Sequence, residues 1–226
     1  MRPRDRILPS LLVVVSLLVL TAVLLKMSQA EGVRAAEQAE SLAMSWQIET
    51  VESVTAASTS LSVDSSDTPH ISYFETYVVD DYIYGDLIYA HRSRSTWFTE
   101  TVTASVGWDH PLSDTSLSLD SLDQPHIAFH AMNPDYDPYT GGDLVYAFHD
   151  GGAWHVETVD RGRVHEPVGA YASLVLDVED RPHIGYVSYT YEDGNTSLAY
   201  AYLPETGWFT ETVDGDLAVS NILVPS

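Results

Sequence analysis

The chain contains no cysteine among its 226 residues. This excludes disulfides, thiol catalysis, iron–sulfur clusters and a lipid-modified amino-terminal cysteine. The fold must therefore be stabilised by packing alone. A hydrophobic content of 45%, with 11% aromatic residues, is ample for a packed core.

Basic residues are also scarce. Ten Lys and Arg stand against 33 Asp and Glu, the formal net charge is -23, and no lysine follows Lys26. A surface of this charge repels phosphate backbones and anionic polymers, so nucleic acids and acidic glycans are poor partners. Cations, neutral sugars and proteins remain. The carboxylates also keep an exported protein soluble, which is the simplest reason for their number.

Long apolar runs are absent except at the N-terminus. Three arginines within the first six residues precede an apolar stretch from Ile7 to Leu25, which is the order of a secretory signal. Ser28 and Ala30 suit a signal-peptidase cut after residue 30, but the apolar stretch is also long enough to span a bilayer as an uncleaved anchor. Residues 1–30 are thus predicted to be a signal peptide or a signal anchor, and residues 31–45 a polar linker.

Either alternative places the rest of the chain outside the cytoplasm. We therefore expect an extracellular or cell-surface protein that contacts a membrane only through its N-terminal segment.

The remaining residues, 46–226, repeat one pattern at a period of 51 to 57 residues. Each unit carries a run that ends in Asp, then Pro-His-Ile-x-Tyr/Phe, then Leu-x-Tyr-Ala, then Trp-x-x-Glu-Thr-Val. The Pro-His-Ile motifs begin at Pro69, Pro125 and Pro182, and the Trp motifs begin at Trp46, Trp97, Trp154 and Trp208. Alternating β-branched and aromatic residues between Asp, Gly, Pro and Ser turns predict four antiparallel strands per unit.

Four strands in roughly 50 residues is the size of a β-propeller blade. The predicted fold is all-β: a partial β-propeller of about three four-stranded antiparallel blades, preceded by the N-terminal signal or anchor helix. We expect blades at about 59–102, 115–159 and 172–213, each with strands A, B, C and D in order. A flanking strand is expected at each end, at Trp46–Val51 and near Ile222–Val224.

These motifs resemble those of secreted bacterial β-propellers with Trp-x-x-Glu-Thr-Val and Pro-His-Ile-x-Tyr repeats, which are distantly similar to sialidase-like propellers. The resemblance covers residues 46–226 and implies a fold, but no activity, because such propellers serve many functions. The sialidase Asp box, Ser-x-Asp-x-Gly-x-Thr-Trp, is absent from the sequence.

Two residue types recur once per repeat and invite a functional interpretation. Three histidines suggest a zinc site, and three aspartates at the ends of the A strands suggest glycosidase acids. These residues are His70, His126 and His183, and Asp64, Asp120 and Asp177. Equivalent positions of successive blades do not converge, and Asp before a turn caps its own backbone. Packing histidines and turn aspartates are therefore expected.

The unequal loops are more informative. The B-to-C and D-to-A connections are long and emerge on one face, which we call the long-loop face, and long loops on a rigid scaffold usually carry function. Aromatic rings stack on sugars and carboxylates accept hydrogen bonds from their hydroxyls. The candidate ligand-binding residues on this face are Tyr82, Tyr84, Trp108, Tyr136, Tyr139 and Tyr191.

One of these loops has the alternate acidic spacing of a calcium site. Asp135, Asp137 and Asp143 are the candidate metal ligands. The EF-hand pattern fails, because Pro138 stands where it needs glycine and Leu144 where it needs glutamate. A calcium site here would therefore be of another kind.

The sequence favours a non-enzymatic extracellular recognition or scaffold module that binds neutral carbohydrate or a protein partner through the long-loop face. The alternative is a glycoside hydrolase or lyase of sialidase-like propeller architecture, with acids near the axis. A purely structural surface protein is a third interpretation.

Propellers close with four to eight blades, and a blade without a neighbour exposes an apolar sheet. We therefore expect a longer protein, two chains that pair as a homodimer with six blades, or an open stack of blades.

Overall fold

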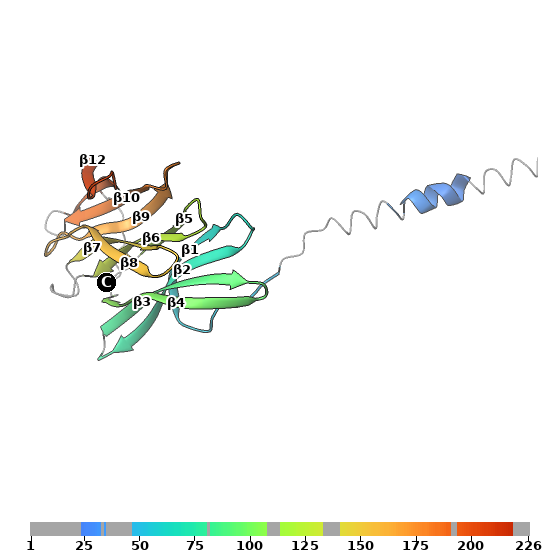
Figure 1. Cartoon of the computed structure of the whole chain (residues 1–226), viewed down its shortest axis with the longest axis horizontal. Helices are drawn as coiled ribbons and strands as arrows, with labels where there is room; N and C mark the ends of the chain where they lie inside the picture. Colours follow the sequence, from blue (N-terminus) through green and yellow to red (C-terminus); the bar gives the residue numbers. More distant parts are fainter. Residues whose placement is uncertain are drawn as a thin grey trace, which may run out of the picture. The chain divides into compact units, whose positions relative to one another are not determined.

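The computed structural model describes residues 24–32, 34, 47–80, 82–107, 114–132, 141–190 and 194–218. The chain divides into two units, Met1–Glu49 and Thr50–Ser226. Within the first unit, residues 24–32 are helical (Figure 1). Among the described residues, no helix is long and apolar enough to cross a membrane. The arginines and the start of the apolar stretch of the predicted signal or anchor lie outside the described residues.

The second unit is all-β, and its described part contains twelve strands in three four-stranded antiparallel sheets, which we call blades 1, 2 and 3 (Figure 1). Blade 1 consists of β1 (Ala56–Val63), β2 (Pro69–Val79), β3 (Tyr82–Ser93) and β4 (Thr96–Gly107). Blade 2 consists of β5 (Thr115–Leu119), β6 (Pro125–Met132), β7 (Gly142–His149) and β8 (Trp154–Asp160). Blade 3 consists of β9 (Val168–Leu176), β10 (Pro182–Thr190), β11 (Asn195–Tyr202) and β12 (Phe209–Ala218). The predicted all-β, three-blade fold is confirmed.

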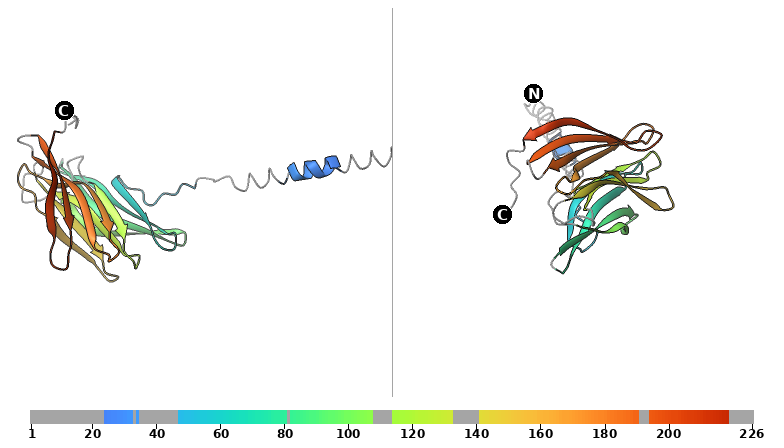
Figure 2. Two further views of the ribbon diagram at one scale, coloured as in Figure 1. Left: turned by 90° about the horizontal axis from the view of Figure 1, so that it is seen from above. Right: turned by 90° about the vertical axis from the view of Figure 1, so that its left-hand side faces the viewer.

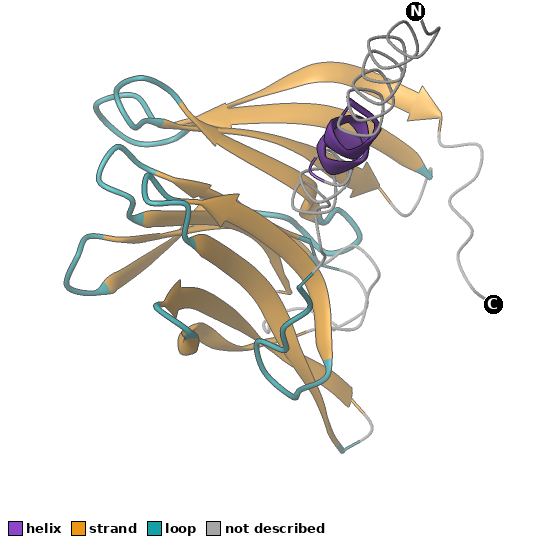
Figure 3. Cartoon of the chain, turned by 90° about the vertical axis from the view of Figure 1, so that its right-hand side faces the viewer, coloured by secondary structure: helices purple, strands orange, loops and turns teal. Residues whose placement is uncertain are grey.

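The strands of each blade pair in sequence order, so every blade is a simple meander from A to D. A single backbone pairing, between Gly107 and Met132, also joins β4 of blade 1 to β6 of blade 2. Figure 2 shows the three sheets stacked in chain order, and Figure 3 shows the same layers of strands from another side.

The blades pack face to face through apolar side chains that alternate along each strand. In the Leu-x-Tyr-Ala motif of blade 1, Leu87 and Tyr89 pack in a cluster with blade 2, whereas Ile88 and Ala90 lie in a cluster on the opposite face. The same motif of blade 2 divides in the same way between its two neighbours. Because successive residues of a strand point to opposite faces, one short motif serves two interfaces.

Each A-to-B turn is closed by its first aspartate. In blade 2, Oδ1 of Asp120 accepts hydrogen bonds from the backbone N–H groups of Leu122 and Gln124, at 2.8 and 2.7 Å. Blades 1 and 3 repeat these bonds. The recurrent aspartates are therefore turn caps, as the sequence predicts.

The second aspartate of the turn links neighbouring blades. The carboxylate of Asp123 accepts hydrogen bonds from the backbone N–H and the hydroxyl of Ser65 in blade 1, at 2.9 and 2.5 Å. Asp180 of blade 3 accepts the same pair from Ser121 of blade 2, at 2.9 and 2.6 Å. We call this contact the serine–aspartate link. It sets the lateral register of one blade on the next.

Two expectations about the edges of the blades need correction. The B-to-C connection of blade 1 is no long loop, because β2 and β3 continue as a paired ladder that reaches Val79 opposite Tyr82. The strand expected at Trp46–Val51 is not formed in its described part, since residues 47–55 are irregular. This segment has no C strand of its own blade with which to share backbone hydrogen bonds. The second flanking strand, near Ile222–Val224, lies outside the described residues.

The serine–aspartate link predicts a difference between two equivalent aspartates. Asp123 and Asp67 share a positive φ of 61°, but the side chain of Asp67 accepts no bond from another blade within the described residues. Asp123→Ala is expected to lower the free energy of unfolding by about 1 to 2 kcal/mol more than Asp67→Ala. The backbone strain of alanine is the same in both variants and cancels. Urea unfolding of the two variants measures the difference, and equal losses would contradict the link.

Candidate functional site

Most of the residues predicted on the long-loop face lie outside the described residues. These are Trp108, Tyr136, Tyr139 and Tyr191 among the aromatic candidates, and Asp135 and Asp137 among the metal ligands. Tyr82 begins β3, but its side chain is not described. Their roles in binding a sugar or calcium stay predictions.

The structure places Tyr84 on a strand instead of a loop. Its ring stacks on that of Tyr77, the residue opposite it across the ladder, with centroids 6.1 Å apart. The hydroxyl of Tyr77 in turn donates a hydrogen bond to Asp86 at 2.9 Å. One face of the Tyr84 ring is therefore covered within its own hairpin.

Asp143 is buried near the start of β7, where it fixes a close approach of the backbone. Its Oδ1 accepts a hydrogen bond from the backbone N–H of Gly162 at 3.0 Å. A Cβ on Gly162 would lie 2.2 Å from the carbonyl oxygen of Gly142, so only glycine fits there. Among the described residues, no three His, Asp or Glu side chains are grouped as a metal site would require.

The recurrent histidines are held separately, one in each blade. Nδ1 of His70 lies 2.5 Å from the hydroxyl of Tyr89, and its Nε2 lies 3.4 Å from Oδ2 of Asp64. His183 has the same contacts, with Tyr200 and Asp177. His126 is bonded to the hydroxyl of Tyr146 and faces Asp120. This Asp–His–Tyr chain repeats within each blade, which confirms the expected packing histidines.

A pocket of about 390 Å³ opens between blades 2 and 3 at the end of the blades opposite the long-loop face. Blade 3 contributes residues of its short A-to-B and C-to-D turns, and blade 2 contributes the adjoining ends of β6 and β7. We call it the short-turn pocket. Its lining residues are His126, Tyr146, Phe148, Asp180, Arg181, Pro182, Leu203, Pro204 and Glu205. Sequence reasoning missed it because it searched the long loops.

The repeat separates the structural lining residues from the specific ones. His126, Tyr146, Asp180 and Pro182 belong to motifs present in every blade, and their contacts are those described above. The remaining polar lining residues do not recur. Arg181 and Glu205 stand where the preceding repeat has Gln124 and Gly151. Phe148 belongs to the repeat, because His91 and Tyr202 stack on the histidine and tyrosine of their own blades in the same way. A sequence signal therefore exists: it is the departure from the repeat within short turns.

Arg181 is held in place at the rim of the pocket. Its Nε donates to Oδ2 of Asp177 at 2.8 Å, and its Nη2 lies 2.7 Å from Asp177 and 2.8 Å from Glu179. The hydrogen bond to Asp177 is the main cause that raises the pKa of Arg181 above its ordinary value. The described contacts engage Nε and Nη2, which leaves the N–H groups of Nη1 for a ligand.

An aromatic wall stands beside this guanidinium. The ring of Phe148 stacks on those of His126 and Tyr146, with centroids 5.9 and 5.8 Å apart. Burial lowers the pKa of His126 and raises the pKa of Tyr146. Both groups are therefore uncharged at neutral pH, and the wall is neutral.

The carboxylates of the pocket do not form a glycosidase pair. Such enzymes need two carboxyl groups that flank the bond to be cleaved, one as acid and one as base or nucleophile. Both oxygens of Asp180 accept hydrogen bonds from Ser121, so this group is committed to the serine–aspartate link. Glu205 is the other lining carboxylate, and it is exposed. The pocket is suited to binding.

No family model matches this chain, and no curated protein matches it either. Among solved structures, the chain is similar to a fucose lectin from Kordia zhangzhouensis that was solved in complex with methyl-fucoside. The alignment covers 68% of this chain and 96% of that chain, at 17% sequence identity and a TM-score of 0.45. Both values are too low to carry an inference about the ligand. The resemblance to sialidase-like propellers stays a prediction.

The buried histidine beside the pocket predicts a pH dependence of stability. Because burial holds the pKa of His126 below its ordinary 6.5, the unfolded chain binds more protons than the native chain as the pH falls through 6.5. Stability should therefore be lower at pH 5.5 than at pH 7.5. His126→Asn removes the imidazole that takes up this proton. The free energy of unfolding should therefore fall less between pH 7.5 and pH 5.5, although the variant is less stable at pH 7.5.

The control is the same substitution at an exposed histidine, His165→Asn. Urea unfolding at both pH values measures the effect. A His126→Asn variant that loses as much stability as the unmodified chain between pH 7.5 and 5.5 would contradict the assignment.

Proposed function

We propose that the chain is an extracellular carbohydrate-recognition module that binds a neutral sugar in the short-turn pocket. The observation that carries the proposal is the fixed guanidinium of Arg181, at a turn position that departs from the repeat, in the same pocket as the Phe148 ring. The predicted export signal supports an extracellular site of action.

The size and lining of the pocket suit one or two sugar rings. A volume of about 390 Å³ lies at the lower end of the range for small-molecule sites. The aromatic wall offers a ring on which the apolar side of a sugar can stack, the Nη1 groups of Arg181 donate to hydroxyls, and Glu205 accepts from them. Because Arg181 is already held by two carboxylates, little side-chain freedom is lost on binding.

The charge of the pocket favours an uncharged sugar. The positive charge of Arg181 is balanced by Asp177 and Glu179, and the whole chain has a net charge of -23. A sialic or uronic acid would approach against this field. The hydroxyls of a neutral sugar carry no such cost.

The test is binding of the full chain to an array of neutral and acidic glycans, followed by calorimetric titration with the best neutral sugar. Arg181→Gln places at this turn the residue that the preceding repeat already carries in Gln124, so the turn should be retained. Affinity is expected to fall about tenfold or more, because a charge-assisted donor is lost.

Arg163→Gln is the matched control, since Arg163 is an exposed arginine of the D-to-A connection, away from the pocket. It should bind as the unmodified chain does. If the chain bound none of the neutral glycans, the proposed function would be overturned. An affinity that falls with Arg163→Gln and not with Arg181→Gln would move the site to the long-loop face.

A further inference from the structure

We infer that two copies of this chain associate head to tail, with the free face of blade 3 of one copy docked on the free face of blade 1 of the other. The inference does not rest on the proposed function, because the short-turn pocket lies between blades 2 and 3 of a single chain.

The first free face belongs to blade 1. Leu61, Leu117 and Leu174 hold the same position in the A strands of the three blades. Leu117 and Leu174 are 6% and 5% exposed, because the preceding blade covers them, whereas Leu61 is 61% exposed. Blade 1 therefore carries an interface leucine that no blade covers in the described part of the chain.

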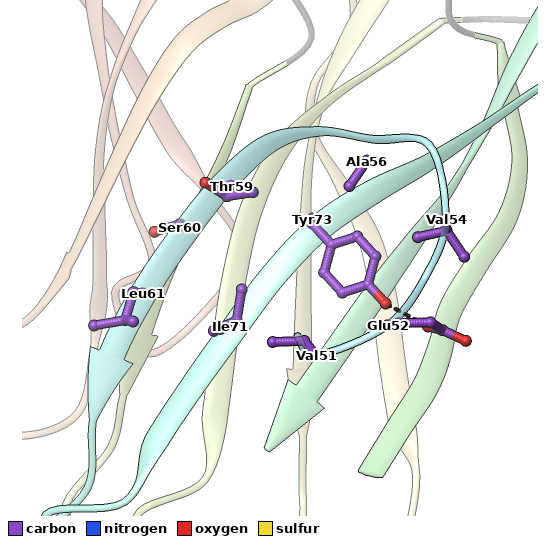
Figure 4. A pocket seen from close by; sticks show the side chains of 9 residues that line it. All are labelled: Val51, Glu52, Val54, Ala56, Thr59, Ser60, Leu61, Ile71 and Tyr73. Atoms are coloured by element: carbon purple, nitrogen blue, oxygen red, sulfur yellow. Dashed lines mark hydrogen bonds between the residues drawn. The ribbon is translucent and has the colours of Figure 1, made fainter. Parts of the chain in front are cut away.

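A pocket of about 250 Å³ marks the uncovered part of this face (Figure 4). Leu61, Ile71 and Tyr73 line it from β1 and β2, and Val51 and Val54 line it from the segment that precedes β1. At the interface of blades 1 and 2, the equivalent place is filled by Phe74, Leu87 and Tyr89 of the preceding blade. The missing occupant is thus the C-terminal face of a blade.

Blade 3 exposes such a face. Val213 is 58% exposed, whereas its equivalents Val102 and Val159 are 8% and 9% exposed against the following blade. Leu198 is likewise exposed, although its equivalents Leu87 and Leu144 are fully buried. The two ends of the stack therefore present the two halves of an interface that the chain makes twice internally.

Polar groups on the two free faces also correspond. At the internal interfaces, the indole N–H of Trp154 donates to Glu100 and that of Trp208 donates to Glu157, each at 3.1 Å. The equivalent indole of blade 1, Nε1 of Trp97, is buried and has no hydrogen-bond partner in the described structure. Glu211 of blade 3 is the equivalent exposed acceptor.

A second polar contact follows the same rule. The hydroxyl oxygen of Ser60 accepts a hydrogen bond from the backbone N–H of Leu117 at 3.0 Å. The hydroxyl oxygen of Ser116 accepts one from the backbone N–H of Leu174 at 2.9 Å. Ser173 holds this position in blade 3 and is exposed. Docking on blade 1 brings Ser173 to the backbone N–H of Leu61, so the hydrophobic contacts and these two polar contacts match in one register. The serine–aspartate link is not repeated there, because Val178 stands in blade 3 where the other blades have Ser65 and Ser121.

The segment before β1 covers part of the face in the single chain. Val51 and Val54 pack beside Tyr73, and the carboxylate of Glu52 accepts a hydrogen bond from the hydroxyl of Tyr73 at 2.7 Å (Figure 4). In the same way, Asp160 at the end of strand D of blade 2 accepts a hydrogen bond from the hydroxyl of Tyr186, the equivalent of Tyr73 in blade 3. The segment therefore takes the place of a preceding D strand, and β12 of the second copy must displace it on docking.

A second copy fits this face better than an unrelated partner, because the occupant must carry the blade pattern of serine, leucine, tyrosine and glutamate in one spacing. Two copies would together bring six of the described blades into one assembly, which is within the range of closed propellers. A heterologous interface that is used twice closes such a ring.

The test is the mass of the full chain in solution, from light scattering after size-exclusion chromatography. The unmodified chain is expected to be a dimer whose association tightens as sodium chloride is raised, because salt screens the repulsion of two acidic copies. Leu61→Asp and Val213→Asp each place a charge on one free face and should weaken the dimer about 100-fold or more. Both residues are exposed in the single chain, so both variants should fold, as circular dichroism would verify.

The most direct test is to mix the Leu61→Asp and Val213→Asp variants and measure the mass again. Each retains the half of the interface that the other has lost, so a one-to-one complex should return through a single interface. Val79→Asp, at an exposed valine of the blade 1 hairpin, is the matched control and should remain dimeric. A monomeric unmodified chain, variants that stay dimeric, or a mixture that forms no complex would each overturn the proposal.

Discussion

Face-to-face packing of four-stranded sheets is the interaction on which the rest of this structure depends. Leu87 and Tyr89 of blade 1 face blade 2, while Ile88 and Ala90 face the opposite way. Each blade is therefore apolar on both sides and needs two neighbours to bury its surface. The serine–aspartate link and the indole–glutamate bonds add direction to this packing, because they join defined positions of successive blades.

The same repetition explains where a specific site can arise. A residue required in every blade has its hydrogen bonds satisfied by the repeat, as the Asp–His–Tyr chains show. The gap between two blades becomes selective only where a turn departs from the pattern. Arg181 and Glu205 are such departures, and they lie beside the aromatic wall between blades 2 and 3, which is a recurrent part of the blade.

Much of the fold follows from the sequence, because the motif of each strand and turn recurs in all three repeats. The blade motifs predict the strands, the turn aspartates and the packing role of His70, His126 and His183. The site was not predictable in the same way. The short-turn pocket joins Phe148 of blade 2 to Arg181 of blade 3, and such a meeting depends on how neighbouring sheets are aligned. The hairpin at Tyr77 and Tyr84 was predicted as a loop, because turn-forming Asp80 and Asp81 mask two strands that continue to pair.

Hydrogen exchange of the full chain with and without a bound neutral sugar tests the central claim most directly. If the sugar occupies the short-turn pocket, amides of the A-to-B and C-to-D turns of blade 3, at 177–181, 203 and 205–208, should gain protection, because ligand binding suppresses local opening. Amides at the tip of the blade 1 hairpin should exchange as before. Protection confined to that hairpin and the other long connections, with the blade 3 turns unchanged, would contradict the account.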